Sequence, residues 1–91
     1  MYANFLLGSL VVTEAAAARL GRAPLDLFAR HAVNDHGALT KDEFTSNMKS
    51  MRSMGRIISR FPVDPTDPQS GFVLVETDES WHETVAKLEG E

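Results

Sequence analysis

The stretch LTKDEFTSNMKSMRSMGRIISRF (residues 39–61) decides the fold, because a complete helix signal is followed there directly by a strand signal. Thr40 is a favoured helix-capping residue, and Glu43, three positions later, can complete a capping box. Acidic residues fall in the first turn and Arg52 near the end, as the helix dipole favours. Gly55 then marks the stop. The sequence therefore predicts a helix that begins after Thr40 and ends before Gly55.

Three apolar side chains recur along this predicted helix. Phe44, Met48 and Met51 are spaced i, i+4 and i+7, which places them on one helix face. A methionine stripe of this kind is typical of a hydrophobic core rather than of a cofactor site. We therefore expect the stripe to be buried, and Phe44→Ala to destabilise the protein by roughly 3–5 kcal/mol.

Two strands are predicted after the helix. Residues 56–61 (RIISRF) and 72–75 (FVLV) are rich in β-branched and aromatic residues, and Pro62, Pro65 and Gly71 mark a polar connection between them. These segments are predicted to form an antiparallel hairpin with a long loop. The short apolar run at residues 6–12 is predicted to be a further strand that pairs with the hairpin.

The remaining segments predict short helices. Thr13 can cap a brief helix that ends before Gly21, and Pro24 suits the first turn of a second helix. Residues 80–88 begin with a capping-box pattern, which favours a helix, although the same residues also suit a short closing strand. The predicted fold is a single α+β domain over residues 1–91, with three to four short helices packed on a small antiparallel sheet of two to three strands.

Composition limits the classes of protein that the chain can represent. The 91 residues suffice for one domain, and the absence of cysteine removes disulfides and thiolate zinc sites. No apolar run approaches the roughly 20 residues of a membrane-spanning helix. The apolar start of the chain has no basic residue before it, and Glu14 interrupts the region where a secretory signal would be cleaved. We expect a cytoplasmic protein.

Charge is distributed unevenly along the chain, whose net charge is −4. Residues 41–60 are basic, whereas residues 61–91 carry many carboxylates and only one lysine. Such asymmetry can mark a surface that binds a partner, although charged runs also commonly just face water. The acidic residues that we select as a candidate partner-binding face are Asp64, Asp67, Glu76, Asp78, Glu79 and Glu83.

The stretch RHAVNDHG (residues 30–37) gathers polar side chains in eight residues. His31 and His36 are five positions apart, so they do not share a helix face as the histidines of a metal-binding HExxH motif do. We predict no metal and no cofactor. The structural alternative is that Asp35, His36 and Gly37 end a helix and turn the chain.

Several motifs resemble those of a group of short, mostly uncharacterised proteins encoded on plasmids, integrative elements and phages. The pattern of that group is RHxxGDWG, then Asp and Asn, then GxRIxSxY, then WVITExDRSxT. The chain has RHAVNDHG, Asp42, Asn47, GRIIS at 55–59 and FVLVETDES at 72–80, but it departs from the pattern at Asn34, His36 and Glu79. The resemblance spans about residues 7–80 and implies a mobile-element protein in a bacterial host.

Residues and resemblance together define a candidate polar centre. One interpretation is a ligand-binding or catalytic pocket. The other is a structural network, in which Arg56 pairs with Asp35 or Glu76 and Asn47 bonds to backbone, and this is the interpretation that we favour. The members of the candidate centre are Arg30, His31, Asp35, Asn47, Arg56, Glu76 and Asp78.

Three functions remain open from the sequence. The first is a non-enzymatic binding protein of a mobile element, such as an inhibitor of a CRISPR effector or restriction enzyme, whose acidic face meets a basic nucleic-acid-binding complex. The second is a small enzyme that uses His31, Asp35, Arg56 and Glu76. The third is a nucleic-acid-binding accessory protein that uses a basic stripe, which the acidic isoelectric point of about 5.3 disfavours. That stripe comprises Lys49, Arg52, Arg56 and Arg60.

Overall fold

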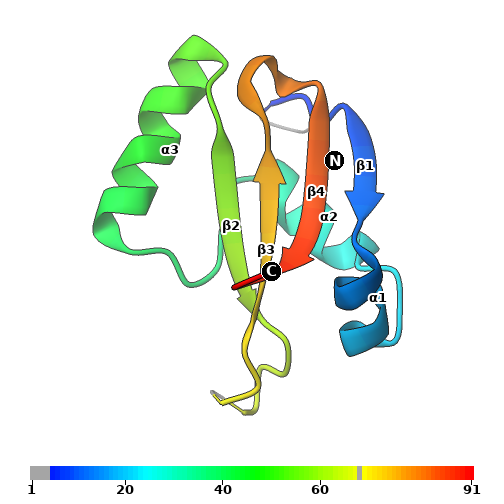
Figure 1. The fold of residues 1–91 in the computed structure, drawn as a ribbon. Coiled ribbons are helices and arrows are strands. Elements are labelled where there is room, and N and C mark those ends of the chain that lie inside the picture. Colours follow the sequence, from blue (N-terminus) through cyan, green and yellow to red (C-terminus); the bar gives the residue numbers. More distant parts are fainter. Residues whose placement is uncertain (1–4, 68) are drawn as a thin grey trace.

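A computed structural model describes residues 5–67 and 69–91 of the chain. Figure 1 shows three helices beside a four-stranded sheet, which confirms the predicted α+β class. The elements in chain order are β1 (Ser9–Val12), α1 (Glu14–Leu20), α2 (Leu25–Ala32), α3 (Lys41–Ser53), β2 (Ile57–Pro62), β3 (Phe72–Thr77), the short 3-10 turn η1 (Glu79–Trp81) and β4 (Glu83–Leu88).

The sheet has the strand order β1-β4-β3-β2. The pairs β2–β3 and β3–β4 are antiparallel, so the predicted hairpin is present, but β1 pairs with β4 in parallel. The prediction of a purely antiparallel sheet of two to three strands was therefore wrong in strand number and in the direction of β1. A parallel pair needs a long connection, and everything from α1 to β3 lies between β1 and β4 in the chain.

The final element is a strand, which corrects our preference for a helix over residues 80–88. Ser80 and Trp81 have φ angles of 66° and 56°, and this left-handed backbone stops the helical turn that the capping-box pattern begins. From Glu83 the chain alternates between the two faces of the sheet, with Thr84 and Ala86 buried. As a strand, this segment can form backbone hydrogen bonds on both sides, because it lies between β3 and β1 in the sheet.

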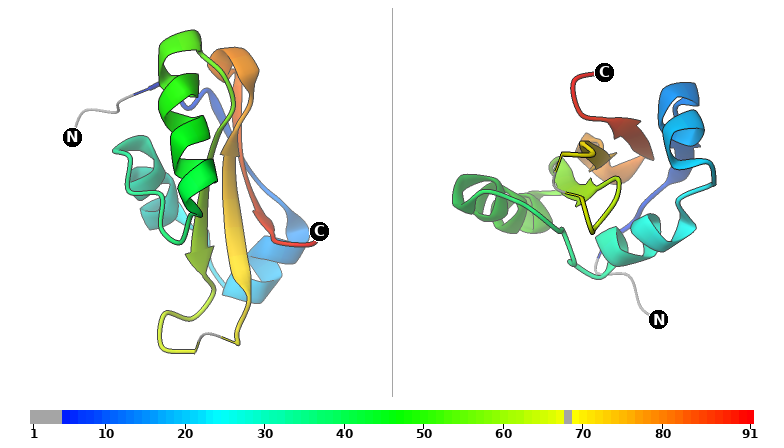
Figure 2. Two further views of the ribbon diagram at one scale, coloured as in Figure 1. Left: turned by 90° about the vertical axis from the view of Figure 1, so that its left-hand side faces the viewer. Right: turned by 90° about the horizontal axis from the view of Figure 1, so that it is seen from below.

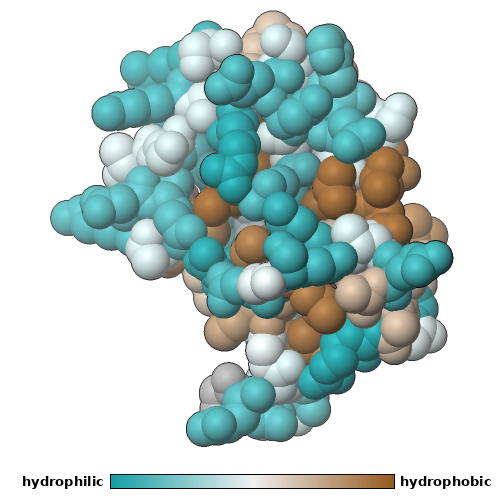
Figure 3. Space-filling model, in the orientation of Figure 1, coloured by the Kyte–Doolittle hydropathy of each residue, from teal (hydrophilic) through white to brown (hydrophobic). Residues whose placement is uncertain are grey.

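The hydrophobic core lies on one face of the sheet. Phe61, Val73 and Val75 are at most 1% exposed, and Leu27 and Phe28 of α2 pack against them. Figure 1 shows α2 behind the strands, whereas no helix of the described chain crosses the front face. We call that front face the uncovered face; Figure 3 shows that it is mostly hydrophilic, with scattered hydrophobic side chains.

Helix α3 runs beside β2 rather than over the core, as both views in Figure 2 show. The buried side chain of α3 is Asn47, whereas Phe44 and Met48 are each 53% exposed and Met51 is only partly buried. The prediction that Phe44, Met48 and Met51 form core was therefore wrong. The physical reason is that α3 meets the sheet through hydrogen bonds: the Asn47 amide donates to the Ile58 carbonyl (2.7 Å) and accepts from the Ile58 amide (3.0 Å).

The helix signals at Thr13, Gly21 and Thr40 were read correctly. Thr13 caps α1, and Gly21 ends it with a left-handed φ of 71°. Thr40 and Glu43 form the predicted capping box at the start of α3. The left-handed residue at the end of α3 is Met54, one position before the predicted stop.

Candidate functional site

The two histidines of RHAVNDHG meet inside the protein through a serine from β2. His31 Nδ1 lies 2.5 Å and His36 Nδ1 lies 2.7 Å from Ser59 Oγ. His31 and Ser59 have no solvent exposure, and His36 is 7% exposed. The resulting buried cluster resembles a nucleophile–base pair in composition, but no substrate can reach Ser59 in this arrangement.

The cluster continues through two threonines to a backbone carbonyl. His31 Nε2 lies 2.9 Å from Thr77 Oγ1, which lies 2.7 Å from Thr84 Oγ1, and Thr84 donates to the Leu7 carbonyl at 2.6 Å. Because the Leu7 carbonyl can only accept, Thr84 accepts from Thr77, and Thr77 accepts from His31 Nε2–H. A neutral His31 then accepts the Ser59 hydroxyl proton at Nδ1, which leaves His36 Nδ1 to donate to Ser59 Oγ.

Electrostatics agrees with this assignment. Burial lowers the pKa of His31 to about 3, and the nearby His36 contributes in the same direction. Burial also lowers the pKa of His36, which Asp35 partly opposes. The two rings meet edge to face with centroids 5.6 Å apart. We read this cluster as a structural network that ties α2 to the middle of the sheet.

The seven residues of the candidate polar centre lie in different parts of the protein. Arg30 and Asp35 form a half-exposed pair (2.7 Å) whose guanidinium also lies 4.4 Å from the Phe61 ring centroid. The hydrogen bond between the two side chains lowers the pKa of Asp35 and raises that of Arg30. Gly37, at the end of the same stretch, has a φ of 68°, and a Cβ there would lie 2.2 Å from the Arg60 carbonyl oxygen. This segment therefore ends α2 and closes on β2.

Three members of the centre lie around α3 and the uncovered face. Asn47 bonds to Ile58 as described, and Arg56 pairs with Glu76 at 2.7 Å. Asp78 instead accepts the backbone amides of His82 and Glu83 (2.7 and 2.9 Å) in the turn before β4. The Arg56–Glu76 pair and the Asn47–backbone hydrogen bonds are contacts that we expected if the candidate centre is a structural network.

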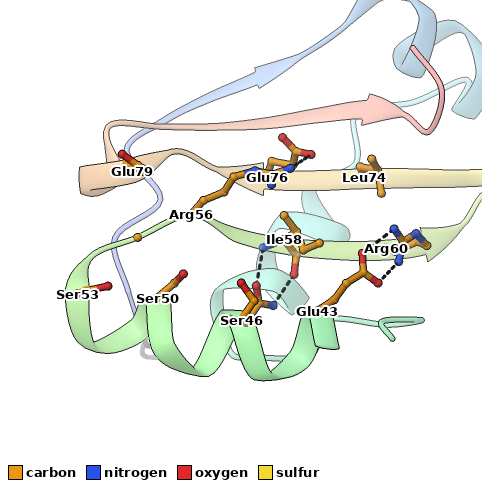
Figure 4. A pocket seen from close by; sticks show the side chains of 12 residues that line it. Glu43, Ser46, Ser50, Ser53, Arg56, Ile58, Arg60, Leu74, Glu76 and Glu79 are labelled. Atoms are coloured by element: carbon orange, nitrogen blue, oxygen red, sulfur yellow. Dashed lines mark hydrogen bonds and ion pairs between the residues drawn. The ribbon is translucent and has the colours of Figure 1, made fainter. Parts of the chain in front are cut away.

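A polar groove of about 640 Å³ lies between α3 and the uncovered face. Figure 4 shows serine hydroxyls of α3 on one side and Ile58 and Leu74 of the sheet on the other. Arg60 closes one end through hydrogen bonds of 2.6 and 2.9 Å to Glu43 and one of 2.6 Å to Glu89. The Arg60 guanidinium lowers the pKa of Glu43 to about 2, and the two carboxylates raise the pKa of Arg60. Sequence reasoning missed the groove serines: Ser46, Ser50 and Ser53.

The six acidic residues fall into two groups. Asp64 and Asp67 lie in the β2–β3 loop, at the lower end of Figure 1, whereas the other four lie toward the β3–β4 turn. Strand β3, about 17 Å long, runs between the loop and the turn, and Glu76 lies near its turn end. We call the second group the acidic turn; it consists of Glu76, Asp78, Glu79 and Glu83.

The four residues of the basic stripe are also divided. Arg56 and Arg60 line the polar groove, where carboxylates pair with both. Lys49 and Arg52 are exposed on α3 and do not line that groove. The described geometry therefore offers no single row of four cations to a nucleic-acid backbone.

No family model, curated protein or solved structure matches the chain. Within residues 5–67 and 69–91, no three histidine, aspartate or glutamate side chains are grouped as a metal site would require. No helix in the described ranges is long and apolar enough to cross a membrane.

Proposed function

We propose that the protein acts by binding a basic partner protein through the acidic turn. The observation that supports this proposal is the gathering of four carboxylates at one end of the uncovered face. Arg56 and Lys87 both pair with Glu76, at 2.7 and 3.5 Å. Glu79 and Glu83 are exposed, and neither is in an ion pair among the described residues.

The acidic turn is held in one conformation by backbone contacts. Asp78 accepts two amides of the turn, and Trp81 Nε1 donates to the Gly55 carbonyl at 2.9 Å. A turn that is ordered before binding loses little conformational entropy when a partner docks. A basic partner would relieve the repulsion between Glu79 and Glu83 and would be attracted from a distance.

The resemblance to mobile-element proteins suggests which basic partner to test. A plasmid or phage in a bacterial cytoplasm gains from blocking a host defence complex, and CRISPR effectors and restriction enzymes carry basic grooves for nucleic acid. On this proposal the acidic turn occupies or borders such a groove. The protein is then an inhibitor that works by binding and needs no cofactor.

The test compares two charge reversals of equal size. Glu79→Lys with Glu83→Lys reverses the acidic turn, and Asp64→Lys with Asp67→Lys makes the same change in net charge at the other end of β3. Affinity is measured against purified CRISPR effector complexes and restriction enzymes, together with protection of incoming plasmid DNA in cells. We expect the first pair alone to weaken binding by roughly tenfold or more, with wild-type affinity falling as salt rises.

Two results would contradict the proposal. An equal loss of affinity in both double variants would show that binding depends only on the net charge of the protein. Full activity of a folded Glu79→Lys/Glu83→Lys variant would show that the acidic turn is not the binding surface.

A further inference from the structure

The side of α3 that faces away from the polar groove carries a second surface, which is apolar. A cavity of about 180 Å³ is lined by Phe44, Asn47, Met48 and Met51 of α3 together with Asn34 and His36. Figure 2 shows that α3 stands apart from α2 on this side. We call this surface the α3 groove.

The α3 groove is exposed although its lining is hydrophobic. Phe44 and Met48 are each 53% exposed. Large apolar side chains gathered on a surface mark a site of protein contact more often than isolated ones do. Methionine, which is flexible and polarizable, suits a surface that must adapt to a bound side chain.

Unpaired cations border the α3 groove. On a helix with 3.6 residues per turn, Arg52 lies next to Met48 (i+4) and Lys41 lies next to Phe44 (i+3), with Lys49 further round on the solvent side. None of these three is in an ion pair within residues 5–67 and 69–91, whereas Arg22, Arg30, Arg56, Arg60 and Lys87 each pair with a carboxylate. An apolar groove beside a basic rim is complementary to a ligand that is apolar on one face and acidic on the other.

We infer that the α3 groove binds an acidic amphipathic helix of a partner protein. The apolar stripe from Phe44 to Met51 is about 10 Å long, which matches two turns of a docked helix with anchors at i, i+3 or i+4, and i+7. Carboxylates beside those anchors meet the basic rim. This surface is separate from the acidic turn, and the inference does not depend on the proposed function.

Charge argues for a partner protein rather than a second copy of the chain. If two copies packed α3 against α3 about a two-fold axis, the helices would run antiparallel or parallel. Arg52 of one copy would then approach Lys41 of the other, or each cation would approach its own equivalent, and like charges at an interface are unfavourable. An acidic helix meets the same rim with opposite charge.

The probe is a random library of displayed peptides of about four helical turns, selected against the wild-type protein. We expect enriched peptides to be acidic, with apolar residues at helical spacing. Binding of the enriched peptides is then measured with purified variants. Met48→Glu tests the groove, and Leu25→Glu, at a 66% exposed leucine on α2, is its matched control.

We expect Met48→Glu to weaken peptide binding by roughly tenfold or more and Leu25→Glu to leave it unchanged. Lys49→Glu with Arg52→Glu should weaken binding roughly two- to fivefold at low salt and less at high salt. This second variant changes only exposed side chains, so it still tests the proposal if Met48→Glu fails to fold.

Three results would overturn the inference. Peptides that bind wild-type and a folded Met48→Glu protein equally would place the binding site elsewhere. Enrichment of basic or uncharged peptides, or no enrichment, would exclude an acidic helix as the occupant. A wild-type dimer in light scattering that Met48→Glu converts to a monomer would assign the groove to a second copy.

Discussion

Helices α2 and α3 both carry an apolar stripe, yet only the stripe of α2 is buried. Leu27 and Phe28 of α2 pack on the core face of the sheet and are 5% and 3% exposed. Phe44 and Met48 of α3 have equally regular spacing but remain half exposed. The difference lies in the side chain that faces the sheet, because α3 presents Asn47 to β2. Periodicity shows that a helix face is apolar, but not what covers it.

The sharpest test of this comparison is a pair of identical substitutions. Phe28→Ala removes a buried ring and should lower the free energy of unfolding by roughly 3–5 kcal/mol. Phe44→Ala, in contrast, should cost less than about 1 kcal/mol, because its ring already meets solvent. Both values come from urea unfolding followed by circular dichroism. A large loss from Phe44→Ala would restore the core position that the sequence pattern suggested.

The structural features that could be predicted from the sequence are those whose contacts join residues or elements close together in the chain. Thr13 and Thr40 cap helices through backbone groups three residues away, so their roles follow from local spacing. The β2–β3 hairpin also joins consecutive elements. Residues 83–88 could not be assigned in the same way, because their strand is stabilised by β1, more than seventy residues earlier.

The candidate polar centre failed to assemble for a related reason. His31 and His36 do meet, but through Ser59, which lies 28 and 23 residues away from them in sequence. Nothing in RHAVNDHG points to that serine. The one local signal is Ser59 itself. It alternates with Ile57 and Phe61, so it falls on the buried face of the predicted strand although it is polar.

The second prediction concerns the contact that holds α3 in place. Asn47→Ala removes two hydrogen bonds to Ile58 and exposes the edge of β2, so it should cost about 2–3 kcal/mol. The neighbouring Ser46→Ala, at an exposed position of the same helix, should change stability by less than about 0.5 kcal/mol. Denaturant midpoints report the loss, and hydrogen exchange at the Ile58 amide locates it. Unchanged protection of that amide in Asn47→Ala would show that α3 is held by other contacts.

The third prediction uses His31, the fully buried histidine of α2. The pKa of His31 is about 3 in the folded protein and about 6.5 in the unfolded chain. The unfolded state therefore binds more protons between these values, so the stability contributed by neutral His31 is present above pH 6.5 and is lost as the pH falls toward 3. Stability should drop by about 2 kcal/mol between pH 7 and pH 5, where few carboxylates titrate.

The control for this titration is His31→Gln, which removes the imidazole but keeps a polar side chain in the network. Its stability should be lower at pH 7, and its change between pH 7 and pH 5 should be smaller than that of the wild type, with only the lowered pKa of His36 left to contribute in the same direction. Urea unfolding at several pH values measures how the stability of each protein changes with pH. If the two proteins lose the same stability on acidification, His31 does not stay neutral in the folded state, and its Nδ1 then donates to Ser59 Oγ instead of accepting from it.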